Sequence, residues 1–117
     1  MTEISPVTVE QAIRTCANRI ADGVKVCDER YRLFLQADRD YDQAFAAAYL
    51  DHSGAAHEKR YAAEINTLRE REVRDMFDAA YRYADRQAKA LENELRAWQS
   101  VGASLRATYG AAGVGEH

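Results

Sequence analysis

The sequence predicts an all-α protein, in which two long antiparallel helices form a helical hairpin and the hairpins assemble into an oligomeric helical bundle. Helix breakers are rare, because the 117 residues include one proline and six glycines. Apolar residues recur in steps of three and four through most of the chain, as they do along one face of a helix. Only residues 51–54, with the sequence DHSG, form an interior cluster of turn residues. The length and even composition indicate a single domain.

Helix one is expected to begin near Val9, after a disordered N-terminus of residues 1–8. Thr8 and Gln11 are spaced as a T-x-x-Q capping box, which satisfies free backbone amides at a helix start. Gly23 allows a kink or a break, but the apolar spacing keeps its phase there, so we expect one continuous helix. The apolar series, interrupted only by Asp38, comprises Val9, Ile13, Cys16, Ile20, Val24, Cys27, Tyr31, Phe34, Tyr41, Phe45 and Ala48.

Helix two is expected to follow a bend at residues 51–56 and to end at Gly110. The hairpin domain is then residues 9–110, and residues 111–117 form a flexible tail. A second apolar series predicts which face of this helix packs against helix one. It comprises Tyr61, Ile65, Leu68, Met76, Ala80, Tyr83, Gln87, Leu91, Leu95, Trp98, Gly102, Leu105 and Tyr109.

Self-association is expected, because two helices with one apolar face each cover one another only in part. The predicted oligomer interface consists of Leu91, Leu95, Trp98 and Leu105, since large aromatic side chains carry a disproportionate share of interface energy. An alternative architecture is a monomeric bundle of three or four helices.

That alternative requires breaks in the predicted helices at Gly23 and near Arg74.

Charge and hydropathy narrow the possible locations and partners. The net charge of −3 and the pI near 5.6 argue against a polybasic nucleic-acid or membrane-surface binder. No apolar run approaches the ~20 residues of a membrane span, and the first residues lack the pattern of a secretory signal. We therefore expect a soluble cytoplasmic protein, in the host cytoplasm if a phage encodes it.

The two cysteines are expected to be reduced and buried. Cys16 and Cys27 are eleven residues apart, which on one helix places them about 16 Å from each other, too far for a disulfide. A redox pair or an interchain disulfide is the alternative.

The sequence contains no pattern typical of an enzyme. His52 and His57 flank the bend beside acidic residues, which makes a zinc or iron site an alternative. Their spacing differs from the one-turn spacing of an HExxH motif, so solvated turn residues are the preferred interpretation. Phosphate-binding loops, nucleophile elbows and Cys-His pairings are absent from the sequence. We expect no catalytic residues, metal, cofactor or small-molecule substrate.

Basic residues form a more informative pattern on helix one. Arg14, Lys25, Arg32 and Arg39 follow one another at intervals of eleven, seven and seven residues, which places them on one face away from the apolar series. We call these four residues the basic line. Asp28 lies close enough to weaken its positive potential.

Helix two carries a similar series that acidic residues interrupt. Its members are Arg60, Arg71, Arg82, Lys89 and Arg96. Glutamate or aspartate precedes a basic residue by four positions at Arg74, Arg82, Lys89 and Arg96, which is the favourable order for helix ion pairs. These arginines are therefore expected mainly to stabilise the helix.

Three segments between Tyr41 and Gly110 resemble one protein family. They are an alanine-rich helix end, AFAAAYLDHSG, a charged helix start, EKRYAAEINTLRERE, and a helix end, LRAWQSVGASLRATYG. They are similar to segments of phage recombination mediators of the UvsY type. The resemblance implies a small, non-enzymatic oligomer that binds single-stranded DNA, helps displace the single-strand binding protein and loads a RecA-like recombinase.

The resemblance also implies DNA contacts by Lys59 and Arg60 after the turn, with Tyr49 just before it. The chain departs from the family pattern because no lysine or arginine lies between Arg39 and Gly54. The expected nucleic-acid-binding residues are therefore the basic line together with Lys59 and Arg60.

Two function classes remain open at this point. The first is a recombination mediator that binds single-stranded DNA. The second is a helical protein-interaction module, such as a phage-encoded inhibitor or adaptor of a host protein that does not bind nucleic acid. The interleaved acidic residues of helix two favour the second class, and the basic line of helix one favours the first.

Overall fold

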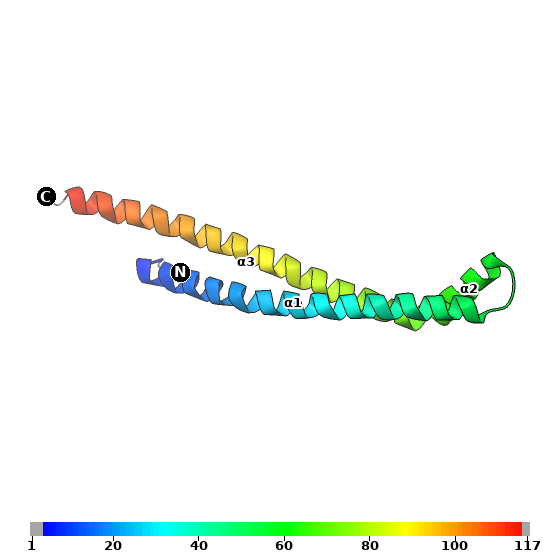
Figure 1. The fold of residues 1–117 in the computed structure, drawn as a ribbon. Helices are drawn as coiled ribbons and strands as arrows, with labels where there is room; N and C mark the ends of the chain where they lie inside the picture. The colour runs from blue at the N-terminus through cyan, green and yellow to red at the C-terminus, as the bar shows by residue number, and fades with distance from the viewer. Residues whose placement is uncertain (1–3, 116–117) are drawn as a thin grey trace. The chain divides into compact units, whose positions relative to one another are not determined.

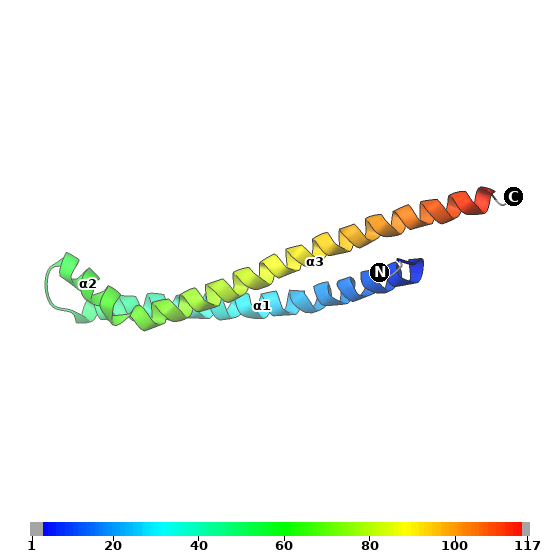
Figure 2. The ribbon, with the colours of Figure 1, turned by 180° about the vertical axis from the view of Figure 1, so that it is seen from behind.

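The computed structural model describes the backbone of residues 4–115 and the side chains of residues 4–110. Within this range the chain forms three helices and no strand: α1 (Pro6–Asp51), α2 (Ala56–Asn66) and α3 (Leu68–Gly115). The predicted all-α hairpin is confirmed. The chain divides into two compact units, a terminal unit made of the chain up to Lys25 and from Arg86, and a turn unit, Val26–Asp85. In each unit α1 and α3 lie side by side and antiparallel (Figure 1, Figure 2).

The start of α1 lies at Pro6, so the predictions of a start near Val9 and of a Thr8 cap are wrong. The backbone amide of Thr8 donates to the hydroxyl of Ser5 at 3.2 Å, and the amide of Val9 donates to the carbonyl of Ser5 at 3.0 Å. Ser5 is therefore the N-cap. Pro6 occupies the first helical position, where its missing amide hydrogen costs no hydrogen bond.

Gly23 lies within the continuous helix α1, as predicted. The alternative bundle with breaks at Gly23 and near Arg74 is excluded, because α1 and α3 each continue through these positions. The end of α1 at Asp51 and the bend at residues 51–56 are also as predicted. Gly54 has a φ of 140°, a conformation that favours glycine, and this turn residue lets the chain reverse.

The predicted second helix is interrupted at Thr67. Thr67 is buried, and its hydroxyl donates to the carbonyl of Ala63 at 2.6 Å. A hydroxyl that binds this carbonyl competes with the helical hydrogen bond to the same oxygen, and the preceding Asn66 is itself a poor helix former. The chain resumes as α3 at Leu68.

The helix α3 extends beyond its predicted end. It continues through Gly110 to Gly115, so the predicted tail at residues 111–117 is wrong as far as Gly115. Glycine ends a helix when it adopts a left-handed conformation, and Gly54 is the only described residue with a positive φ. No described helix combines the length and the apolar character that crossing a membrane requires.

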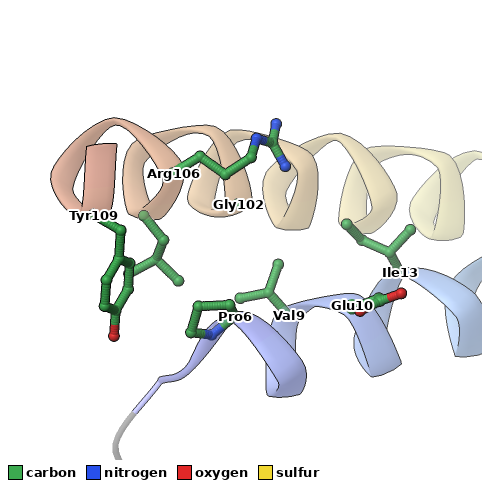
Figure 3. A pocket seen from close by; sticks show the side chains of 8 residues that line it. Pro6, Val9, Glu10, Ile13, Gly102, Arg106 and Tyr109 are labelled. Carbon is green, nitrogen blue, oxygen red and sulfur yellow. The ribbon is translucent and has the colours of Figure 1, made fainter. Parts of the chain in front are cut away.

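In the terminal unit, the two helices approach closely at Gly102. Val9, Cys16 and Leu91 are buried in this unit. A Cβ atom added to Gly102 would lie 3.2 Å from Cγ1 of Val9, so the missing side chain allows this approach. Figure 3 shows Val9 pointing from α1 toward α3, beside an open hollow of about 480 Å³ between Pro6 and Tyr109.

In the turn unit, small residues form the centre of the contact between helices. The buried residues are Ala37, Ala63, Thr67 and Ala84. Alanines let two helix backbones approach closely, and aromatic rings fill the space beside them. One example is the pair Tyr31 and Tyr81, whose ring centroids lie 5.0 Å apart.

The second apolar series was predicted to face α1, and this is wrong for its first half. Ile65, Leu68, Met76 and Tyr83 are 52–67% exposed, and the buried residues of α2 and α3 lie on the other side of these helices. The prediction is correct from Leu91 to Leu105, where Leu91 and Gly102 are buried, whereas Tyr109 is 59% exposed. Counting large apolar side chains failed where the helices pack through alanine instead.

Candidate nucleic-acid interface

The basic line lies on the exposed surface of α1. Arg14, Lys25, Arg32 and Arg39 are all exposed. No described residue forms a hydrogen bond or an ion pair with Lys25 that would neutralise its charge. The hydrogen bond of Arg39 goes to the neutral amide oxygen of Gln36, at 3.1 Å, so its charge is also not neutralised.

The other two members of the basic line carry an acidic partner one turn earlier. Arg14 contacts Glu10 at 2.9 Å, and Arg32 contacts Asp28 at 2.7 Å. All four side chains are more than half exposed, so each pair is screened by water and contributes little to stability. A phosphate group can therefore compete with these carboxylates at small cost.

A second basic group lies where α2 starts. Lys59 and Arg60 point from the first turns of α2, which the glycine turn brings back beside the end of α1. The ammonium group of Lys59 lies 5.5 Å from the ring centroid of Tyr49 on α1. Arg60 contacts Glu64 at 3.3 Å, with 71% of its side chain exposed.

Tyr49 and Arg60 help to line a hollow at the end of the turn unit. Its volume is about 500 Å³, and it lies between α1 and α2. The lining residues are Phe45, Tyr49, Ala56, His57, Arg60 and Tyr61. We call this the turn hollow. Its walls combine three aromatic rings with a guanidinium and an imidazole, which are the groups that stack on bases and contact phosphates.

The structure brings together the residues that the resemblance selected, Tyr49, Lys59 and Arg60. It also places Phe45 and Tyr61 beside them. This cluster could have been predicted from the sequence, because Phe45 and Tyr49 are one helical turn apart before the turn and Tyr61 follows soon after it. His52 and His57 are exposed. Among residues 4–115, no group of three or more histidine, cysteine or acidic side chains is arranged to hold a metal ion.

Ion pairing on helix two differs in part from the predicted pattern. Arg82 contacts Asp78 at 3.0 Å as predicted. Arg74 does not contact Glu70; it contacts Asp75 at 3.3 Å and Asp38 of α1 at 3.8 Å.

The pair predicted at Glu92 and Arg96 also differs. Arg96 donates to the amide oxygen of Asn93 at 3.2 Å, so its charge is not neutralised by that contact.

Arg74 belongs to a polar layer inside the hairpin that the apolar pattern did not predict. Its guanidinium lies 4.6 Å from the ring centroid of Tyr41, and its side chain is only 28% exposed. The sequence indicated this polar layer only through Asp38, the one residue that interrupts the first apolar series and that contacts Arg74. A half-buried arginine between an aromatic ring and carboxylates positions helices, and it is not available to DNA.

The predicted oligomer interface lies in the terminal unit. Leu91 is 8% exposed within a single chain, and Leu95, Trp98 and Leu105 are half-buried. The hairpin therefore already covers much of this set. The large exposed apolar side chains of α2 and α3 lie mostly in the turn unit.

Cys16 makes a specific contact in the terminal unit. Its buried thiol donates to the carboxylate of Glu94 at 2.8 Å. This hydrogen bond, together with burial, raises the pKa of Cys16 above its ordinary value. A thiol with a raised pKa is less reactive. Both described cysteines are free, and Cys16 is buried as predicted, whereas Cys27 is only half-buried.

No family model matches the chain, and neither the curated proteins nor the solved structures contain a match.

Proposed function

We propose that this chain is a non-enzymatic recombination mediator, which binds single-stranded DNA as a homo-oligomer and loads a RecA-like recombinase in the cytoplasm. The observation that carries the proposal is the turn hollow. Tyr49 and Tyr61 line it together with Arg60, and Lys59 stands over the ring of Tyr49. Aromatic rings with nearby cations are the usual platform for unpaired bases.

The chemistry of the hollow favours single strands over duplex DNA. A base can stack on an aromatic ring only if it is unpaired, and stacking contributes ~1–3 kcal/mol per base with little sequence preference. Phosphates beside the stacked bases are then within reach of Arg60 and Lys59. Loading a recombinase requires this kind of sequence-independent binding.

The first experiment is a titration of a fluorescent single-stranded oligonucleotide at several salt concentrations. We expect binding that weakens steeply with salt, with a slope in log K of about −0.7 for each neutralised phosphate. Tyr49→Ala should weaken binding about 5- to 150-fold, the equivalent of losing one stacked base. Tyr49→Trp keeps an aromatic ring and should retain affinity.

A matched control tests whether the ring must lie in the turn hollow. Tyr49 is half-buried, and Tyr109 is exposed but lies in the terminal unit, so Tyr109→Ala should bind like the unmodified protein. Circular dichroism checks that Tyr49→Ala remains helical. If the unmodified protein does not retain single strands even at low salt, the mediator function is excluded.

The second candidate function is a protein-interaction module without nucleic-acid binding. The ion pairs of Arg14, Arg32 and Arg60 favour it, because paired arginines offer less free charge to phosphates. This alternative predicts no binding in the titration. It also predicts that substitutions in the turn hollow leave any nucleic-acid signal unchanged.

A further inference from the structure

One face of the turn unit carries large apolar side chains that no described part of the chain covers. Ile65, Leu68 and Met76 are 67%, 52% and 59% exposed, and Ala79 is also exposed. Within α3, at about 100° per residue, Leu68, Met76 and Ala79 fall on the side opposite to Arg74 and Tyr81, which contact α1, while Ile65 lies in α2 before the interruption at Thr67. We call Ile65, Leu68, Glu72, Met76 and Ala79 the outer face. Contiguous exposed apolar side chains of this kind usually mark an interaction site.

The spacing of the outer face is symmetric about Glu72. Leu68 and Met76 each lie four residues from Glu72, and Ile65 and Ala79 each lie seven residues from it. An antiparallel copy of the same face, related by a two-fold axis at Glu72, therefore places Leu68 opposite Met76, both within α3. Ala79 and Ile65 extend the apolar surface on either side, with Ile65 beyond the interruption at Thr67.

The charges beside the centre also fit an antiparallel copy. Arg69 and Arg71 flank Glu72, and neither forms an ion pair or hydrogen bond with another described side chain. Across the two-fold axis, Arg69 lies about one turn from the partner subunit's Glu72, and Arg71 lies near the partner subunit's Asp75. The axis also brings the two Glu72 carboxylates toward each other, and the arginines that are unpaired in one chain offset this repulsion by lying beside carboxylates of the second chain.

We propose that the outer face binds a second copy of this chain, as an antiparallel two-fold contact centred on Glu72. The proposal does not rest on the proposed function, since neither DNA nor a recombinase takes part in the contact. An isologous contact of this kind uses the same patch on both subunits, which symmetric apolar spacing and opposite flanking charges both favour.

Sedimentation velocity over a concentration series tests the association. We expect the unmodified protein to sediment at no less than the mass of a dimer at micromolar concentration. Leu68→Glu places a charge in the contact and should raise the dissociation constant at least about tenfold. Leu50→Glu is the matched control, because Leu50 is 77% exposed but lies outside the outer face. This control should leave the mass unchanged.

Disulfide trapping tests the direction and the register of the contact. In a background with Cys16→Ser and Cys27→Ser, Glu72→Cys alone should form a cross-linked dimer, since position 72 meets itself at the two-fold axis. Leu68→Cys alone and Met76→Cys alone should form no covalent dimer. A mixture of the two variants should form one. A parallel contact would instead cross-link Leu68→Cys with itself, and that result would overturn the proposal.

A charge exchange tests the pairing at the centre. Arg69→Glu brings four carboxylates together across the axis and should weaken the dimer. Adding Glu72→Arg to the same chain restores opposite charges across the axis and should recover the dimer. A monomeric mass for the unmodified protein at all concentrations, or a dimer that Leu68→Glu leaves intact, would overturn the proposal and assign the outer face to a different partner.

Discussion

At the residue scale, single polar contacts explain departures from the expected pattern. Asp38 interrupts the first apolar series because it approaches Arg74, whose guanidinium lies against Tyr41. The second helix is interrupted at Thr67, a buried residue whose hydroxyl binds the carbonyl of Ala63. Periodicity arguments weigh apolar residues, so they locate such positions as gaps and do not reveal what the polar side chain contacts.

The contact between Cys16 and Glu94 gives a testable pKa. We expect Glu94→Gln to lower the pKa of Cys16 toward its ordinary value of about 9.0, because an uncharged amide favours the protonated thiol less than a carboxylate does. The pH dependence of the Cys16 Cβ chemical shift measures this, with Cys27→Ser as background. An unchanged titration in Glu94→Gln would show that the hydrogen bond is not the cause.

The same contact fixes the direction of a pH effect on stability. The folded chain holds the proton of Cys16 more tightly than the unfolded chain, so the stabilising effect is fully present below about pH 9.0. It is lost as the pH rises through the raised pKa of the folded state. Neutral pH therefore leaves this contribution intact.

At the element scale, the sequence predicted α1 and the turn well but the packing of α2 and α3 poorly. The turn at residues 51–56 was predictable because Asp, Ser and Gly each favour a turn for a known reason. The face of α3 was not predictable, because large apolar residues mark either a core or an interface. Alanines contact α1, and the larger Leu68 and Met76 lie outside.

The two interior glycines should respond in opposite ways to alanine. A Cβ atom added to Gly23 would meet no neighbouring atom within 4 Å, so Gly23→Ala should stabilise the helix by about 1 kcal/mol. Gly102→Ala should lose this gain or destabilise, because its Cβ would lie 3.2 Å from buried Val9. Thermal unfolding measures both variants. If both variants are stabilised equally, the side chain of Val9 can move aside at no cost, and the missing side chain of Gly102 is not what allows α1 and α3 to approach closely.

At the scale of the whole molecule, a net charge of −3 must be reconciled with the proposed binding to an anionic strand. The candidate site residues meet this demand locally, through exposed cations on α1 and at the turn hollow. Their placement on an exposed helix face was predictable from intervals of seven and eleven residues. Their ion pairing was only partly predictable, because a side chain such as Arg39 selects among several partners within reach.

Two members of the basic line, Arg32 and Arg39, can be tested against arginines of α3 that make the same kinds of local contact. Arg32 contacts an aspartate four residues earlier, and so does Arg82; Arg39 binds an amide oxygen three residues earlier, and so does Arg96. Reversing the charge of Arg32 and Arg39 to glutamate should lower the affinity for all single-stranded sequences alike and flatten the salt slope by about 1.4, or 0.7 per lost phosphate contact.

The same reversal at Arg82 and Arg96 changes the net charge equally and should affect DNA binding much less. Both double variants should keep their helix content, because all four side chains are exposed. Oligonucleotide titration at several salt concentrations gives the affinity and the slope together. If the two variants lose affinity equally, the effect reflects overall charge. The strand would then not follow the face of α1 that the basic line occupies, and binding would depend on the turn hollow alone.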